Sequence, residues 1–251
     1  MTELVSITDD GPVRTMRMNR PDKKNALTLA MYDALAAGID SARHNPALRC
    51  LLIAGCPGGF CAGNDIGDFV KFATAGGTIG APVIRFLDVL LHCDKPLVAA
   101  VQGNAVGIGT TMLMHCDYVV AGSDARFSAP FVSLGVVPEA ASTLIAPRLM
   151  GHARSFSLLV MGRPMSADDA KAAGLVNMVV APEAVDAEAA KAAREVAALP
   201  PQGVLAARKL LRGSRDAVVA RMHEENALFQ ARLRSDEARA AFEAFLTRKK
   251  A

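Results

Sequence analysis

The sequence contains little of what marks several specialised protein classes. It has no tryptophan and two tyrosines among 251 residues, and 28 Lys and Arg against 25 Asp and Glu leave a net charge of +3. A nucleic-acid-binding protein would show a dense basic stripe or a known motif, so we expect no nucleic acid and only a small anionic partner. The 5 cysteines form no CxxC pair, and their odd number fits reduced thiols better than disulfides or zinc ligands. We therefore expect no metal.

A hydrophobic run long enough and apolar enough for a membrane span is also missing. The longest stretch without a charged residue covers positions 96–116, which is enough on length alone to cross a bilayer. Gln102, Asn104 and His115 interrupt this stretch, and its glycines indicate a turn between a buried strand and a buried helix. The N-terminal residues lack the basic and apolar blocks of a signal peptide. We expect a cytoplasmic protein without a membrane partner.

The chain is long enough to form one sizeable hydrophobic core. A domain of this length buries roughly 70 to 75% of the surface that its unfolded chain exposes, without help from metals or disulfides. Two alternating runs, around residues 4–8 and 13–18, predict a hairpin across residues 9–12. A helix should begin with Thr28 as its N-cap and end near His44, just before Pro46.

The same unit of strand, glycine turn and helix is predicted twice in the first half of the chain. A buried strand at residues 50–54 precedes a loop of turn formers at 55–65, and a helix should follow from Ile66. A second strand at 96–101 precedes glycines at 103, 107 and 109, and a helix should cover residues 110–114. Such turns leave backbone N–H groups unpaired at the start of a helix, where they can bind an anion. They match neither a P-loop nor a dinucleotide-binding motif.

The second half of the sequence is mostly helical. Pro138-Glu139 predicts the start of a helix, because proline is favoured at the first helical position. Ser166 is close to a capping box for a helix that stops at Gly174, and residues 175–180 predict a strand. From Pro182 onward we expect only helices, whose apolar stripes should dock on the core or on a neighbouring subunit.

Five segments together resemble the crotonase (enoyl-CoA hydratase/isomerase) superfamily. They are the segments at 19–27, 59–66, 95–109, 116–117 and 127–139, and their order and spacing match the family to about residue 180. The resemblance implies an α/β fold: a spiral of strand-strand-helix (ββα) turns that forms two nearly perpendicular sheets, with C-terminal helices that pack a homotrimer or a dimer of trimers. It also implies two regions. Residues 1–195 would form the spiral core with the coenzyme A site and the active site, and residues 196–251 the C-terminal helical region.

The resemblance implies an acyl-CoA thioester as substrate, with coenzyme A carried by the substrate and no prosthetic group. The thioester carbonyl oxygen would lie between the backbone N–H groups of Asn64 and Ile108, each of which follows a glycine. The backbone of Ala62, Asp65 and Ile66 would surround the adenine of coenzyme A. Lys24 would lie near a phosphate, and Ala26 would line the pantetheine channel. Lys24 and its basic neighbours fit an ordinary solvated turn equally well.

Glu139 is the expected catalytic base. It lies in a segment similar to the one in which the Δ3,Δ2-enoyl-CoA isomerases of this superfamily carry a single catalytic glutamate, whereas the two hydratase glutamates align with Thr111 and Phe131. One carboxylate can take a proton from C2 of a 3-enoyl thioester and return it at C4. We therefore predict an enoyl-CoA isomerase of fatty acid metabolism. The alternatives are an enoyl-CoA hydratase, another crotonase-type enolate reaction and a non-catalytic acyl-CoA-binding protein.

Overall fold

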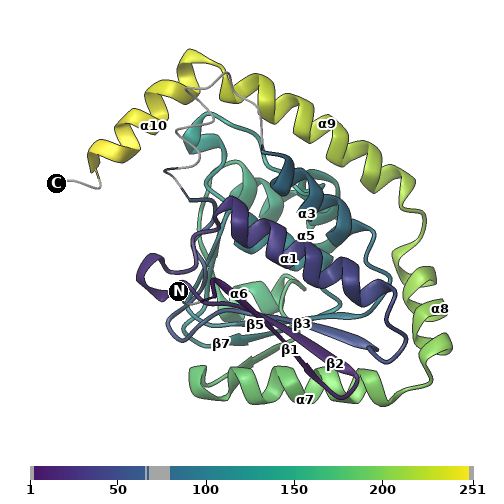
Figure 1. Cartoon of the computed structure of the whole chain (residues 1–251). Helices are drawn as coiled ribbons and strands as arrows, with labels where there is room; N and C mark the ends of the chain where they lie inside the picture. Colours follow the sequence, from purple (N-terminus) through teal and green to yellow (C-terminus); the bar gives the residue numbers. More distant parts are fainter. Residues whose placement is uncertain (1–2, 66, 68–79, 249–251) are drawn as a thin grey trace.

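The computed structural model describes residues 3–65, 67 and 80–248. Within these ranges the chain forms two mixed sheets, helices on both faces of the larger sheet, and an arm of C-terminal helices that curves around the body (Figure 1). The helix predicted from Ile66 lies outside the described residues.

The larger sheet has six strands in the order β1-β2-β3-β5-β7-β10. Strands β1 and β2 form the predicted antiparallel hairpin, and the remaining pairs are parallel. The strand bounds are Val5–Asp10 (β1), Val13–Met18 (β2), Cys50–Ala54 (β3), Leu97–Val101 (β5), Tyr118–Gly122 (β7) and Met178–Val180 (β10).

The smaller sheet has four short strands in the order β4-β6-β8-β9. Their bounds are Gly59–Cys61 (β4), Asn104–Val106 (β6), Arg126–Ser128 (β8) and Met165–Ser166 (β9). Strands β4 and β6 lie inside the two glycine-rich segments that the sequence analysis interpreted as plain turns. Three residues between glycines carry too little pattern to predict a strand, and their pairing partners are distant in sequence.

The helices begin and end close to the predicted positions where a local capping signal exists. Thr28 accepts a hydrogen bond from the Met31 N–H at the start of α1, and Ser166 and Asp169 form a capping box at the start of α6. The helices are α1 (Leu29–Arg43), α3 (Ala81–Leu91), α4 (Ile108–Thr111), α5 (Ser142–Leu159), α6 (Ala167–Ala172), α7 (Val185–Ala198), α8 (Pro201–Arg212), α9 (Asp216–Leu233) and α10 (Asp236–Arg248). Short 3-10 turns include η2 (Met112–His115) and η3 (Val132–Leu134).

The larger sheet is buried on both faces, which explains why its central strands are apolar throughout. Alternate residues of β3 point to opposite sides: Leu51 and Ile53 pack in the core with α1 and α3, whereas Leu52 packs against α7. Helix α7 presents a stripe of small side chains, with Ala189 and Ala193 fully buried, so it approaches the sheet closely.

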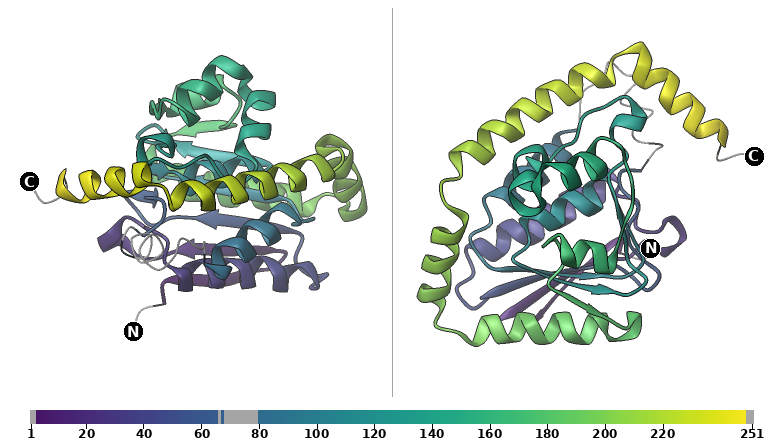
Figure 2. Two further views of the ribbon diagram at one scale, coloured as in Figure 1. Left: turned by 90° about the horizontal axis from the view of Figure 1, so that it is seen from above. Right: turned by 180° about the vertical axis from the view of Figure 1, so that it is seen from behind.

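The C-terminal helices lie along the body of the chain rather than apart from it (Figure 2). Met222 and Phe229 of α9 and Phe242 of α10 are buried in the main core, so the prediction that these stripes dock holds within the chain itself. Arg208 of α8 is also buried, and its Nε lies 2.7 Å from a carboxylate oxygen of Asp117. None of the helices in the described part of the chain combines the length and apolar character that crossing a bilayer requires.

Candidate active site

The two glycine turns meet at one place in the fold. Gly63 has a φ of 88° and Gly107 a φ of 57°, values that favour glycine. A Cβ atom on Gly63 would lie 3.1 Å from the carbonyl oxygen of Val106, so the turns touch through their backbones. Asn64 and Ile108 follow these glycines. Among the described residues, no protein acceptor receives a hydrogen bond from either of their N–H groups, and Ile108 is the first residue of α4, where a helix leaves its N–H without an intrahelical partner.

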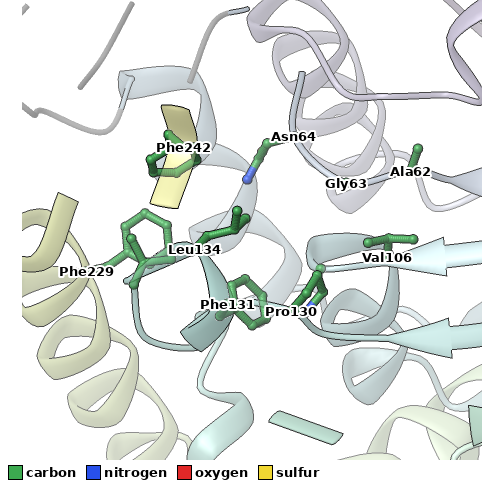
Figure 3. Close-up of a pocket in the computed structure, with 11 residues that line it drawn as sticks. Ala62, Gly63, Asn64, Val106, Pro130, Phe131, Leu134, Phe229 and Phe242 are labelled. Carbon is green, nitrogen blue, oxygen red and sulfur yellow. The ribbon is translucent and has the colours of Figure 1, made fainter. Parts of the chain in front are cut away.

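An apolar cavity of about 120 Å³ lies beside the two turns (Figure 3). Ala62, Gly63 and Asn64 line it from the first turn, and Val106 and Gly107 from the second. The remaining lining residues come from the segment before α5 and from the C-terminal helices: Pro130, Phe131, Leu134, Val136, Phe229 and Phe242. Three phenylalanines therefore share the cavity wall with the two glycine turns.

The two positions at which the motif resemblance places the hydratase glutamates hold no carboxylate in this chain. Phe131 lines the cavity with its ring and is 6% exposed. Thr111 is fully buried in α4, and its hydroxyl donates to the carbonyl of Gly107 at 3.4 Å. Neither side chain can remove a proton from water near neutral pH.

Glu139 is buried, but it does not begin a helix as predicted. Helix α5 starts at Ser142, and Ala140 and Ala141 adopt left-handed conformations with φ of 62° and 54°. Such a pair costs roughly 1–3 kcal/mol per residue and persists only when the surroundings enforce it. The turn places Glu139 three residues before the first residue of α5, and the backbone carbonyl of Glu139 accepts a hydrogen bond from the Ser142 N–H at 3.2 Å.

Burial sets the protonation of Glu139. The residue is 2% exposed and its Oε1 atom has no hydrogen-bond partner within the described part of the chain. Burial, and secondarily the charge of Glu225, raises the pKa of Glu139 to about 8. Glu139 is not itself among the residues that line the cavity, whereas Val136, three residues earlier, is.

His115 holds the turn that follows Glu139. Its Nε2 lies 2.7 Å from the carbonyl oxygen of Ala140, and because a carbonyl only accepts, the imidazole must carry its proton on Nε2. Burial lowers the pKa of His115 to about 4, so the ring is neutral at physiological pH. His115 is therefore a hydrogen-bonded histidine of the core.

Tyr32 connects the neighbourhood of Glu139 with the first glycine turn. Its hydroxyl donates to the side-chain oxygen of Asn64 in a short hydrogen bond. The pKa of Tyr32 is raised by burial first and by the nearby charge of Glu139 second, which places the phenol within electrostatic range of that carboxyl. No motif in the sequence singles out Tyr32 for a role in the site.

Of the residues expected to contact coenzyme A, only Ala62 lines the cavity in the described part of the chain. Ala62 lines the cavity, and its N–H already bonds to the carbonyl of Lys24 at 2.9 Å, so a ligand could use only its carbonyl. Lys24 is exposed in a left-handed turn, and Ala26 does not line the cavity. Asp65 forms an ion pair with Arg20 at 2.7 Å, which engages Arg20 within the protein. Ile66 lies outside the described residues.

Three residues of the C-terminal helices belong to the site although the sequence analysis did not place them there. Phe229 and Phe242 form part of the cavity wall (Figure 3), and Glu225 lies buried close to Glu139. Glu225 is three residues after Met222 and four before Phe229, so it lies on the apolar stripe of α9. A charged residue on a buried stripe is the signal that could have identified it.

Comparison with known proteins identifies the family. The sequence profile described as enoyl-CoA hydratase/isomerase matches residues 9–251. The chain belongs to this family. The predicted crotonase fold is confirmed by a crystal structure of an enoyl-CoA hydratase/isomerase from Pseudoalteromonas atlantica, which superposes with a TM-score of 0.92 at 38% identity and covers 98% of each chain.

Relatives of this crotonase-family chain differ in their named reactions. It is 33% identical to enoyl-CoA delta isomerase 2 of Rattus norvegicus over 98% of its own length, and it spans 64% of that longer protein. It is 29% identical to a "Probable enoyl-CoA hydratase" of Rhizobium meliloti, with 99% of this chain and 97% of the relative covered. The family is thus shown, and the choice between isomerase and hydratase depends on the site.

No group of three or more His, Cys, Asp or Glu side chains in the described ranges is arranged to hold a metal ion. Asn64 is the one residue with a polar side chain among the described residues that line the cavity, and Ile108 follows the lining residue Gly107 without lining the cavity itself. Such a site can stabilise negative charge on an oxygen through N–H donors.

Proposed function

We propose that this chain is an acyl-CoA isomerase that moves the double bond of a 3-enoyl-CoA to the 2-position. The observation that carries the proposal is the buried carboxyl of Glu139 at the isomerase motif position, with Phe131 and Thr111 at the motif positions of the hydratase glutamates.

The N–H groups of Asn64 and Ile108 would receive the thioester carbonyl oxygen. Removal of a proton from C2 shifts negative charge onto this oxygen, and fixed donors bind the charged oxygen better than the neutral carbonyl. Each donor of this kind typically lowers the reaction barrier by about 2.7 to 4 kcal/mol. Main-chain donors suffice, so the side chains at these two positions need not react.

Glu139 would transfer the proton. Its carboxylate takes the proton from C2, and the C–H electron pair forms a dienolate with negative charge on the carbonyl oxygen. As the C=O bond re-forms, the C2–C3 bond becomes double and the electrons of the former C3=C4 bond take the same proton at C4. Nothing is oxidised or reduced, and no water enters. A base whose pKa is about 8 binds the proton more firmly than an ordinary glutamate and releases it readily to a carbanion. The apolar wall that includes Phe131 would exclude water.

Coenzyme A would enter as part of the substrate, and we propose no prosthetic group and no metal. The backbone of Ala62, Asp65 and Ile66 would contact the adenine, Lys24 would face a phosphate, and Ala26 would flank the pantetheine arm. These roles come from the motif positions in the sequence. Exposure of Lys24 in its turn is compatible with a phosphate contact.

The proposed assembly is a homotrimer or a dimer of trimers. Residues 1–195 would supply the catalytic core and residues 196–251 the helical region that packs subunits together. Large apolar side chains on this region support this arrangement, because Leu210 and Leu211 of α8 are 83% and 89% exposed in the single chain. The proposed location is the cytoplasm, and five cysteines without disulfides fit a reducing compartment.

Purified protein mixed with a 3-enoyl-CoA should form the conjugated 2-enoyl-CoA, which ultraviolet absorbance detects. Glu139→Gln should lower kcat by at least about a hundredfold, in line with general-base contributions. Glu195→Gln, an exposed charge on α7, is the control that should leave kcat unchanged. Unchanged turnover in the Glu139 variant would remove this residue from the mechanism.

Hydration of a 2-enoyl-CoA is the second candidate, favoured by the hydratase name of the Rhizobium relative. Incorporation of oxygen-18 from water into the product would identify a hydratase and would exclude a pure isomerase. Calorimetry tests a third candidate, a non-catalytic binding protein. Tight acyl-CoA binding without turnover across a panel of enoyl thioesters would overturn both enzymatic candidates.

A further inference from the structure

Helix α5, which follows Glu139, lacks a cap of its own. Its N-cap residue is Ala141, in a left-handed conformation and without a side-chain hydrogen bond, and its first turn contains no acidic residue. The first N–H groups of a helix need acceptors, and a buried N-terminus without them is costly.

Glu225 of α9 supplies the missing acceptor from a distant part of the chain. Its Oε1 accepts hydrogen bonds from the backbone N–H of Thr143 at 2.9 Å and from the hydroxyl of Thr143 at 2.6 Å. Arg221, one turn earlier on α9, donates to the same hydroxyl at 3.1 Å. Glu225 is 3% exposed, so α9 inserts a carboxylate into the N-terminus of the helix that carries the turn of Glu139.

The second oxygen of Glu225 has no partner. Oε2 of Glu225, Oε1 of Glu139 and Oγ of Ser142 are all buried without a hydrogen bond among the described residues. Two carboxyls that share a buried neighbourhood cannot both be ionised at low cost, because each charge raises the energy of the other.

The hydrogen bonds indicate which carboxyl keeps the charge. Burial raises the pKa of Glu225, but the two donors from Thr143, the backbone N–H of Ala141 and the charge of Arg221 all oppose that rise and stabilise its anion. Glu139 has no donor at Oε1. Glu225 should therefore be the anionic member of the pair, and Glu139 the member that holds the proton.

Other titratable groups near Glu139 are neutral close to pH 7. Burial raises the pKa of the Tyr32 phenol on α1 and raises that of the Cys61 thiol at β4 to about 12. Burial lowers the pKa of His115 on η2 to about 4. Arg221 faces Glu225 from the same helix. Within the described part of the chain, Glu225 is thus the charge that can act on Glu139.

We propose that Glu225 is a positioning residue that fixes the N-terminus of α5 with one carboxylate oxygen and whose charge keeps the proton of the pair on Glu139. This inference rests on the proposed function, in which Glu139 is the base. The charge of Glu225 makes Glu139 a stronger base than an isolated buried glutamate would be. Helix α9 supplies this charge without a role of its own in the proton transfer.

The test compares the pH dependence of wild type with that of Glu225→Gln, which retains an oxygen acceptor for Thr143 but loses the charge. In the wild type, kcat/KM for a 3-enoyl-CoA should rise with pH as Glu139 loses its proton. In the variant, the midpoint of this rise should fall by at least about one pH unit, because the neighbouring charge is gone. Glu195→Gln removes the same charge from α7, on the other side of the sheet, and should leave the midpoint in place. An unmoved midpoint in Glu225→Gln would overturn the proposal.

A second measurement does not depend on isomerase activity. Carboxyl carbon NMR of the full chain with labelled glutamate, assigned with Glu139→Gln, follows the titration of both groups directly. Two coupled carboxyls titrate in linked steps, and the Glu139 midpoint should fall in Glu225→Gln but stay within about half a unit of wild type in Glu225→Asp. Independent single steps near the usual glutamate value in the wild type would overturn the pairing even if the variants failed to fold. If NMR shows the pair while no 3-enoyl-CoA is turned over, the proposed function fails and the pairing stands.

Discussion

Replacing Glu139 with glutamine should stabilise the folded chain, and the gain should increase with pH. The folded-state pKa of Glu139 is raised from 4.5 to about 8. Below about pH 4.5 both folded and unfolded chains hold the proton, so the carboxyl has no pH-dependent cost. Between 4.5 and about 8 the unfolded chain releases its proton while the folded chain keeps it, and stability is lost as pH rises.

The size of the effect follows from the width of this window. Each pH unit between the two pKa values costs about 1.4 kcal/mol of unfolding free energy. The wild-type penalty is therefore roughly 1 kcal/mol at pH 5 and about 4 kcal/mol at pH 8. Glutamine has nearly the same shape as protonated glutamate and does not titrate, so the variant avoids the penalty.

Urea unfolding of wild type and Glu139→Gln at several pH values, at one protein concentration, measures the difference in unfolding free energy. The difference should increase by about 3 kcal/mol between pH 5 and pH 8. Glu195→Gln serves as the reference for loss of an exposed charge. A difference that stays constant over this range would show that Glu139 titrates normally in the folded state, and the reasoning about its burial would be refuted.

Three further substitutions test the site and its support. Gly63→Ala should lower kcat at least about a hundredfold, because its Cβ would lie 3.1 Å from the carbonyl oxygen of Val106 and would displace the N–H donor of Asn64. The control Gly58→Ala has nearly the same positive φ but open space around its Cβ, and it should retain activity. Phe242→Ala should enlarge the cavity and so favour longer acyl chains: kcat/KM for a longer 3-enoyl-CoA, divided by kcat/KM for a shorter one, should rise by about tenfold. An unchanged ratio would show that the acyl chain does not lie against Phe242. Arg208→Met breaks the buried ion pair with Asp117 and should lower the unfolding free energy, measured by urea unfolding, by roughly 3 kcal/mol. This value is near the low end for a buried pair because Asp117 keeps Arg212 as a second partner. A loss below about 1 kcal/mol would contradict a structural role for the pair.

Local signals in the sequence predicted those parts of the structure that local chemistry controls. Thr28 and Ser166 cap helices through hydrogen bonds that reach only three residues along the chain, so their patterns were sufficient. The glycines at 63 and 107 indicated sharp turns because their conformations favour residues without a side chain. The resemblance to the crotonase family supplied the fold, which the comparisons confirm, and directed attention to Glu139.

Long-range contacts decided what the sequence could not. Strands β4 and β6 exist because they pair with each other across more than forty residues, not because three-residue segments prefer to be strands. The sequence gives no signal that Ala140 and Ala141 adopt left-handed conformations, because alanine rarely does so. The prediction of a helix start at Pro138 was wrong because His115 and the packing around it hold this turn in a non-helical shape.

The amino-acid sequence alone determined the periodic apolar faces, the caps, the glycine turns and the presence of one acidic residue at a motif position, because each depends on residues that are neighbours along the chain. The tertiary structure alone decided that Glu139 is buried, that Phe229 and Phe242 close the cavity, and that Glu225 caps a helix 82 residues away. The physical reason is that desolvation and charge pairing depend on which groups meet in space, and only the folded chain brings these groups together.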